Sequence, residues 1–307
     1  MSNLPKIIAL MGQTASGKSK MALKLAKEFN GEIISADSRN IYKNLNIATD
    51  KPEFKKTKQG YFYQGIPHYL VNIVNPDQKF SVAQFKPLAV FKIKEIIQKN
   101  KLPILAGGTG LYIKAVLENY SFPGVAPDNK LRNELEKKAK NKGLETLWQE
   151  LIKIDPGSKN IVDKNNPRRV IRALEVCFKK DKAFSKIKSK KPIQFNSLKI
   201  GIKLSEKKLF QKQSKRVDKM IEKGLIKETK NLINKYGKTQ VLLNTIGYQE
   251  IIPYLEGKIS LKKAIKEIKL HTRQFSKRQE TWFKKEKNIK WVKNFQEAKN
   301  ITKNFLN

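Results

Sequence analysis

One eight-residue segment constrains the fold of this chain more than any other: Gly12, Gln13, Thr14, Ala15, Ser16, Gly17, Lys18 and Ser19. It matches the pattern G-x-x-x-x-G-K-[ST], in which the glycines let the backbone wrap a phosphate and point its N–H groups at it. An apolar run at 7–11 precedes the segment, and helical spacing follows it, so the strand–loop–helix context that the pattern requires is present. We therefore expect a phosphate-binding loop with a positive charge on Lys18 and a Mg²⁺ ligand in the Ser19 hydroxyl.

The rest of the chain supplies the sheet that such a loop needs. Short apolar runs at 32–36 and 102–106 read as strands, with a helix at 82–100 between them, and further strands are expected at 198–204 and 289–292. Alternating strands and helices imply a parallel sheet. We predict an α/β fold of the P-loop NTPase type, with a parallel sheet flanked by helices.

A change in the secondary-structure pattern divides the chain into three segments. From 123 to 190 the strand signals vanish, and helical segments punctuated by proline and glycine replace them. We expect residues 1–122 to form the first part of the P-loop core, 123–190 a smaller all-helical insertion, and 191–307 the return to the core with long basic helices.

Two further motifs follow predicted strands. Asp37 lies in the segment SADSR after the second strand, and Thr109 lies in AGGTG after the third. The carboxyl ends of parallel strands share one rim of a sheet, where α/β proteins build their sites. Each motif alone has a plainer interpretation, Asp37 as a helix cap and the paired glycines as a tight turn.

Net charge indicates the partner. The chain has 65 Lys and Arg against 27 Asp and Glu, a formal charge of +38. Such an excess is typical of proteins that bind polyanions, nucleic acid first among them. Membrane lipid is less favoured, because the basic residues are spread along the chain and the apolar runs are too short to span a bilayer. The single cysteine, Cys177, excludes an intramolecular disulfide. No secretory signal is visible, so we expect a cytoplasmic protein.

These residues, in this order, resemble the tRNA dimethylallyltransferase family. The similarity runs from Ile8 to about Val292 and includes ISADSR (34–39), PILAGGTGLYIK (103–114), NPRRVIRALEV (166–176) and TRQFSKRQETWF (272–283). The chain departs from the family pattern at Gln13, where proline is usual, at Ala48 and Asp50, and at Tyr69, where a second histidine is usual. A zinc-finger extension at the C-terminus is lacking, which suggests the bacterial type.

The resemblance implies a reaction: transfer of the dimethylallyl group from dimethylallyl diphosphate to N6 of the adenine beside the tRNA anticodon, at position 37. It implies that Lys18, the other loop residues and Arg216 bind the diphosphate, with Mg²⁺ as cofactor at Ser19. Asp37 would accept the proton of the amine, and Thr109 would orient base or phosphate. The adenine would have to leave its stack.

The resemblance and the basic clusters together imply an RNA-binding set on a monomeric protein. The anticodon arm of tRNA would contact Asp37, Ser38, Arg39, Asn40, Thr109, Arg132, Arg168, Arg169, Val170, Ile171, Arg172, Gly247, Tyr248, Lys277 and Arg278. We predict that the insertion closes as a lid over this arm. Arg172 has an alternative, an ion pair with Glu175 or Asp155.

Three other functions share parts of this pattern. An adenylate isopentenyltransferase would use the same donor with a free nucleotide. A P-loop small-molecule kinase would transfer a phosphoryl group and would not need so basic a surface. A non-catalytic RNA-binding NTPase would leave Asp37 and Thr109 without a role.

Overall fold

The computed structural model describes residues 4–180, 183–187 and 191–307, and the chain forms two compact units. Met1–Leu117 and Ile193–Asn307 make up the first unit, and Glu118–Pro192 the second. The sequence placed the insertion at 123–190, a few residues inside these bounds.

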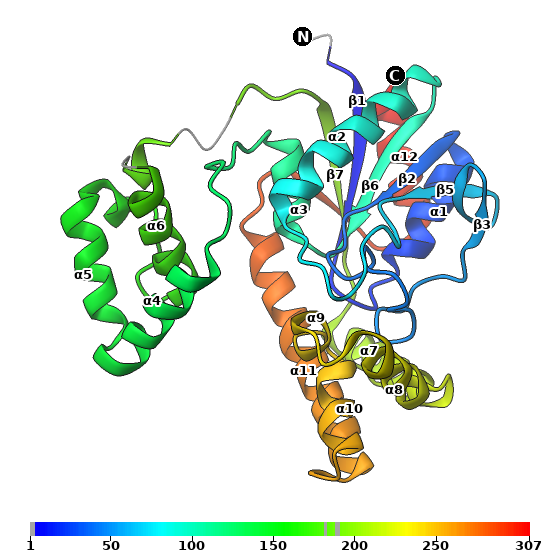
Figure 1. The fold of residues 1–307 in the computed structure, drawn as a ribbon. Helices are drawn as coiled ribbons and strands as arrows, with labels where there is room; N and C mark the ends of the chain where they lie inside the picture. The colour runs from blue at the N-terminus through cyan, green and yellow to red at the C-terminus, as the bar shows by residue number, and fades with distance from the viewer. Residues whose placement is uncertain (1–3, 181–182, 188–190) are drawn as a thin grey trace. The chain divides into compact units, whose positions relative to one another are not determined.

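The first unit is built on one eight-stranded sheet (Figure 1). The strands are β1 (Lys6–Met11), β2 (Gly31–Ser35), β3 (Lys55–Thr57), β4 (Gly60–Tyr63), β5 (Ile66–Tyr69), β6 (Leu102–Gly107), β7 (Asn196–Ile202) and β8 (Ile289–Val292). Their order is β3-β4-β5-β2-β6-β1-β7-β8. All neighbours from β5 to β8 pair in parallel, and only the β3–β4 and β4–β5 pairs are antiparallel. The predicted mostly parallel α/β sheet is confirmed.

Helices cover both faces of the sheet because its central strands are apolar on both sides. Ile8 and Leu10 of β1 pack in a cluster with α1 (Lys18–Glu28) and α12 (Phe295–Leu306). Ile7, Ala9 and Met11 pack on the opposite face, in a larger cluster with α2 (Val82–Gln98) and α3 (Gly110–Leu117). A continuous apolar run is what a strand buried on both faces requires.

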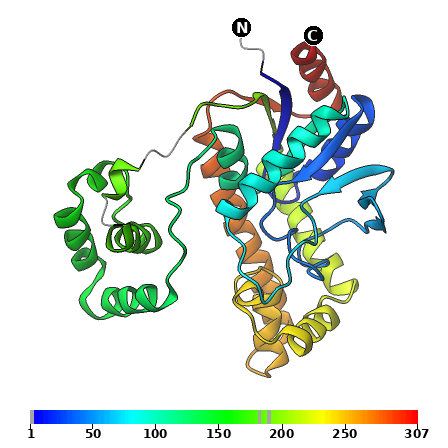
Figure 2. The same cartoon turned by 45° about the horizontal axis from the view of Figure 1, so that its top comes forward.

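A group of helices from the last third of the chain packs into the same larger cluster (Figures 1 and 2). They are α7 (Glu206–Glu222), α8 (Leu225–Tyr236), α9 (Gln240–Leu243), α10 (Tyr248–Leu255) and α11 (Leu261–Lys284). In α11, Ala264, Ile268 and Phe283 are buried at helical spacing, while Lys277 and Arg278 are exposed. This amphipathic pattern fixes which side of α11 faces the sheet.

The second unit contains only helices among its described residues. They are α4 (Asn129–Lys142), α5 (Leu144–Ile154), a 3₁₀ turn at Pro156–Asn160, α6 (Pro167–Lys180) and a second 3₁₀ turn at Phe184–Lys186. Leu147, Leu151, Val170 and Leu174 are fully buried in a core made of the unit's own side chains. Among the described residues of the whole chain, no helix is long and apolar enough to cross a membrane.

Candidate active site

The phosphate-binding loop joins β1 to α1 through two residues with left-handed backbone. Ala15 has φ 62° and Gly17 has φ 96°, and α1 begins directly afterwards at Lys18. The Lys18 ammonium turns back over the loop and donates to the Gln13 carbonyl at 2.6 Å. The Lys18 ammonium thus lies over the loop, next to the N-terminus of α1, where anions bind favourably.

Two cations are enclosed at this loop. Burial lowers the pKa of Lys18 to about 8, an effect that the negative charge of Asp37 opposes and the positive charge of Arg216 adds to. Burial also lowers the pKa of Arg216, whose Nη1 donates to Thr14 Oγ1 at 2.9 Å and lies 3.6 Å from a carboxylate oxygen of the exposed Asp50. Buried cations of this kind are stabilised by an anion placed between them.

Two buried polar atoms beside the loop lack hydrogen-bond partners among the described residues. They are the Ser16 hydroxyl oxygen and the Arg216 Nε, which come from the loop and from α7. Leaving a buried donor unpaired costs about 1–3 kcal/mol, and such groups mark the position of a ligand or water that accepts from them. A phosphate group between loop and α7 would satisfy both.

Asp37 and Thr109 meet at the ends of neighbouring strands. The Thr109 hydroxyl accepts from the Ser38 N–H at 3.0 Å and donates to the Ser38 hydroxyl at 3.3 Å. The Thr109 N–H donates to the Ala36 carbonyl at 3.2 Å. One Asp37 oxygen accepts from the Arg39 N–H at 2.9 Å. The second and third motifs of the sequence thus form one structure, as their strand-end positions imply.

A cavity lies beside Lys18 and Asp37. Its polar lining also includes Ser19, Ser35, Asn40 and His68, and its apolar lining comes from Ala22, Ile33, Pro52, Phe54, Val71 and Ala106. The Asn40 side-chain carbonyl is buried without a partner among the described residues. Phosphate chemistry at one end and an apolar wall beside it suit an allylic diphosphate.

Several site residues carried no signal in the sequence on their own. Gln213 and Gln279 contact Thr14 from α7 and α11, at Thr14 O and Thr14 N respectively. Lys51 donates to Asn72 Oδ1 at 2.6 Å. Burial lowers the pKa of Lys51 to about 7, against the raising effect of Glu228 and Asp37. Only the three-dimensional fold brings Gln213 and Gln279 to the loop.

Residues expected to bind RNA in the first unit fall into two groups. Lys277 and Arg278 are exposed on α11, and Arg39 is half-buried with Nη2 donating to the Asn244 carbonyl at 2.8 Å. Tyr248 is fully buried, and its hydroxyl donates to Glu228 at 2.6 Å. Gly247 has φ 103° and lies against Ala48. Because the Tyr248 side chain packs inside the unit, the structure leaves it no exposed surface with which to contact RNA.

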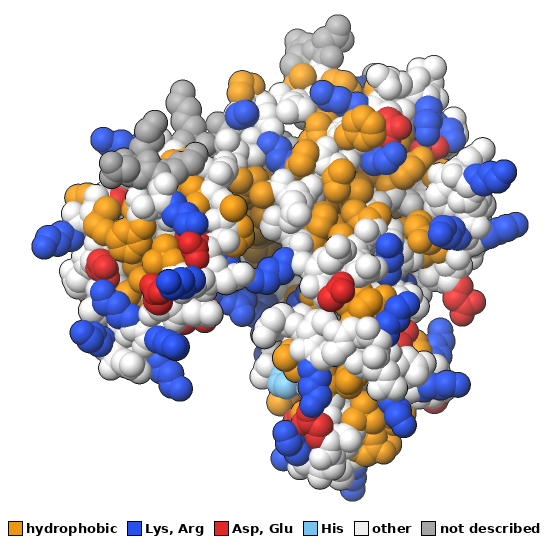
Figure 3. Space-filling model, viewed as in Figure 1, with side chains coloured by type: hydrophobic (Ala, Val, Ile, Leu, Met, Phe, Trp, Pro, Cys, Tyr) orange, Lys and Arg blue, Asp and Glu red, His pale blue; other side chains and the backbone are white. Residues whose placement is uncertain are grey.

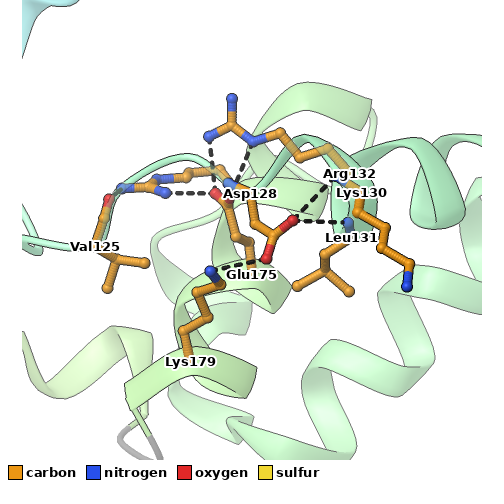
Figure 4. Close-up of polar contacts among 8 residues, drawn as sticks. Val125, Asp128, Lys130, Leu131, Arg132, Glu175 and Lys179 are labelled. Atoms are coloured by element: carbon orange, nitrogen blue, oxygen red, sulfur yellow. Dashed lines mark hydrogen bonds and ion pairs between the residues drawn. The ribbon is translucent and has the colours of Figure 1, made fainter.

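The arginines of the second unit also divide. Arg132 donates to Glu175 through Nε at 2.9 Å and Nη2 at 2.8 Å, and Arg172 pairs with the same carboxylate (Figure 4). Burial alone would raise the pKa of Glu175, but hydrogen bonds from Arg132, the Asp128 N–H and Arg172 hold it below its usual value. The alternative role weighed for Arg172, an ion pair with Glu175, is the arrangement found.

Arg168 and Arg169 differ from this pair because both are exposed near the start of α6. Val170 and Ile171, which follow them, are buried in the unit's core, so their side chains are not exposed for contact with RNA. Lysine and arginine side chains are scattered over the visible surface of each unit rather than gathered on one helix (Figure 3). The positive charge is thus spread over the visible surface and is not confined to one element.

A parallel sheet whose first strand enters a glycine-bounded phosphate loop, with carboxylate and hydroxyl groups at the adjacent strand ends, defines a protein of the P-loop α/β class. Comparison with known proteins narrows this class. The IPP transferase family model matches residues 40–286. The chain belongs to the IPP transferase family.

Individual relatives agree with this assignment. A tRNA dimethylallyltransferase of Acetivibrio thermocellus is 44% identical, over 94% of this chain and 92% of its own length. The crystal structure of a tRNA isopentenylpyrophosphate transferase from Bacillus halodurans is similar with a TM-score of 0.70 and 36% identity, covering 98% and 95% of the two chains. A eukaryotic dimethylallyltransferase acting on tRNA is similar with a TM-score of 0.79 and 28% identity, covering 98% and 79%.

Proposed function

We propose that this chain is a tRNA dimethylallyltransferase that works in the cytoplasm. It moves the dimethylallyl group of dimethylallyl diphosphate to N6 of the adenine at position 37, 3′-adjacent to the anticodon. The products are N6-isopentenyladenosine and diphosphate. The observation that carries the proposal is the pairing of a cationic phosphate loop with Asp37 and Thr109 at neighbouring strand ends of one site.

The donor side of the site has to neutralise a leaving group. As the bond between the allylic carbon and the diphosphate oxygen breaks, negative charge grows on the diphosphate. Lys18 and Arg216 face this charge from α1 and α7, and Ser16 Oγ and Arg216 Nε are two donors that it would satisfy. Charges already fixed in the site need no reorganisation at the moment of transfer, which is why such an arrangement accelerates the reaction.

A Mg²⁺ ion fits the residues present. Mg²⁺ in phosphate sites commonly takes only one or two protein oxygens and completes its shell with phosphates and water. Ser19 offers a hydroxyl in the same cavity as Lys18 and Asp37. We propose Ser19 as the protein ligand. When bound, the metal would neutralise part of the diphosphate charge.

The acceptor side has to activate a weak nucleophile, because the lone pair of the adenine amine is delocalised into the ring. Asp37 lies at the end of β2 with one oxygen anchored by the Arg39 N–H at 2.9 Å. As the bond from N6 to carbon forms, the Asp37 carboxylate takes the proton that N6 loses. Thr109, held against Ser38, orients the base beside it.

The RNA would be held by exposed cations. Arg168 and Arg169 on the second unit and Lys277 and Arg278 on the first are the candidates whose side chains are exposed. We propose that the second unit acts as a lid that contacts phosphates of the anticodon arm. Contacts of this kind position the RNA without reading its sequence.

The test supplies radiolabelled dimethylallyl diphosphate and Mg²⁺ with either unmodified tRNA or free AMP. Label in tRNA, located at adenine 37 by nuclease digestion, is the expected result. Transfer to AMP alone would instead identify an adenylate isopentenyltransferase. If no prenyl group is transferred, a parallel reaction with ATP in which a small acceptor becomes phosphorylated would identify a kinase. RNA binding with no transfer at all would identify a non-catalytic protein.

A further inference from the structure

One buried side chain of α11 joins the two loops of the site. The Gln279 Oε1 accepts from the Thr14 N–H at 2.8 Å, and its Nε2 donates to the Gly108 carbonyl at 2.9 Å. Gln279 is 6% exposed, so both bonds form away from competing water. A primary amide carries a donor and an acceptor at fixed separation, and here each is used once, on a different loop.

The two residues bonded to Gln279 lie in the two loops of the site, the phosphate loop and the loop that carries Thr109. Thr14 lies in the phosphate loop, and its hydroxyl accepts from Arg216. Gly108 directly precedes Thr109, and a Cβ built on it would lie 2.4 Å from Gln279 Nε2 and 3.9 Å from Asp37 Oδ2. The backbone therefore approaches Gln279 as closely as only glycine allows, and Asp37 stands beside this contact.

The neighbouring contacts act on the phosphate loop alone. Gln13 Nε2 donates to the Ser276 carbonyl at 3.2 Å and to the Ser276 hydroxyl at 3.1 Å, one turn before Gln279 on α11. Gln213 Nε2 donates to the Thr14 carbonyl at 3.3 Å from α7. In this set of contacts, Gln279 alone reaches both the phosphate loop and the glycine loop.

We propose that Gln279 is a positioning residue that fixes the separation between the donor's diphosphate cradle and the Asp37–Thr109 acceptor site. This rests on the proposed transferase function. The allylic carbon and N6 must come within about 3–3.5 Å in line with the leaving oxygen, and a misplacement of about 1 Å costs about 100-fold in rate. The Gln279 side-chain amide bridges the two loops and sets this distance before either substrate binds.

The decisive variant is Gln279→Glu. Above the pKa of the new carboxyl, the substituted side chain still accepts from the Thr14 N–H. Its carboxylate cannot donate to the Gly108 carbonyl, so only that hydrogen bond is lost. At pH 8 we expect kcat to fall about 100-fold, the size of a 1 Å misplacement, with the donor KM within about threefold of wild type. As the pH falls, the buried carboxyl protonates and can donate to Gly108 again. The ratio of variant to wild-type kcat should therefore rise.

Two matched variants complete the test. Gln279→Met removes both bonds at similar volume and should lower kcat and raise the donor KM. Gln213→Met removes a contact with Thr14 only and should raise the donor KM with a much smaller loss of kcat. Thermal unfolding of each variant separates folding defects from positioning, and Gln279→Met serves if Gln279→Glu does not fold.

The outcomes are distinct. A Gln279→Glu enzyme with wild-type kcat, or with a kcat ratio independent of pH, would overturn the positioning role. So would a Gln279→Met enzyme whose kinetic pattern matches Gln213→Met. If wild-type protein transfers no prenyl group to tRNA, the proposed function itself fails, and the variants are then irrelevant to that conclusion.

Discussion

The division of the second unit's arginines predicts which of them bind RNA. Arg168 and Arg169 are exposed, and neither guanidinium has an ion-pair partner among the residues that the structure describes. Arg132 and Arg172 are 33% and 28% exposed and share the buried carboxylate of Glu175. Replacing Arg168 and Arg169 together with alanine should therefore weaken tRNA binding and leave the fold intact.

The magnitude follows from the number of phosphates released. Each phosphate contact contributes about 0.7–0.9 to the log–log salt slope of binding, so losing two flattens the slope by about 1.4–1.8. Extrapolated to 1 M salt, where this contribution vanishes, the same figures give a loss of about 25- to 60-fold in affinity at 0.1 M salt and about 5- to 9-fold at 0.3 M.

Filter binding or fluorescence anisotropy with unmodified tRNA, at four or more salt concentrations, measures both quantities. Lys142→Ala with Lys164→Ala, two exposed lysines of the same unit, provides a charge-matched control. An unchanged affinity and an unchanged slope in the double arginine variant would refute the reasoning. Equal losses in the control variant would reduce it to a general effect of net charge.

Three further predictions concern the site and the second unit. Asp37→Asn should lower kcat by about two to four decades in the transfer assay, the contribution of a general base, and a rate near wild type would remove Asp37 from that role. Burial lowers the pKa of Lys18 to about 8, so the free enzyme loses this charge as pH rises through 8; the donor KM should then climb toward tenfold per pH unit, and a flat profile to pH 9.5 would contradict it. Glu175→Gln should destabilise the second unit by about 3 kcal/mol, the low end for breaking a buried ion pair, because the paired arginines are partly exposed. Urea unfolding followed through hydrogen exchange of α4 and α6 measures this loss, and protection equal to wild type would show that the ion pairs contribute little.

The sequence predicted the strands that are buried on both sides, and it also predicted β8, a short strand at one edge of the sheet. The central strands are apolar runs bounded by glycine or polar residues, and all five expected strands are present. The strands β3, β4 and β5, which extend the sheet beyond β2, were not predicted. All three residues of Lys55–Thr57 are exposed, and the strands that follow are four residues long and only half-buried. They form because β5 pairs with β2, β4 pairs with β5 and β3 pairs with β4, which is a tertiary effect that no local pattern encodes.

The site divides along the same line. Lys18, Asp37 and Thr109 could be assigned from sequence because each follows a strand, and parallel strands end at one rim. Gln279 could not, because it reaches Thr14 across 265 positions of the chain. The RNA-contact prediction for Arg132 came from the resemblance and the basic clusters, and neither indicated its pairing with Glu175, which lies 43 positions further on. Charge is visible in a sequence, but the pairing that consumes it is not.

The interior position of β1 has a consequence for the order of synthesis. Lys6 of β1 pairs with Asn196 of β7, so one side of this strand stays open until the entire second unit has been made. The helical core of that unit uses only its own residues, and contacts this local form quickly on a growing chain. The ribosome thus releases a finished helical unit while β1, apolar on both faces, still presents a free strand edge. Slow translation between residues 118 and 196 would prolong the time for which one edge of β1 stays unpaired, and an unpaired apolar edge favours aggregation of the nascent chain.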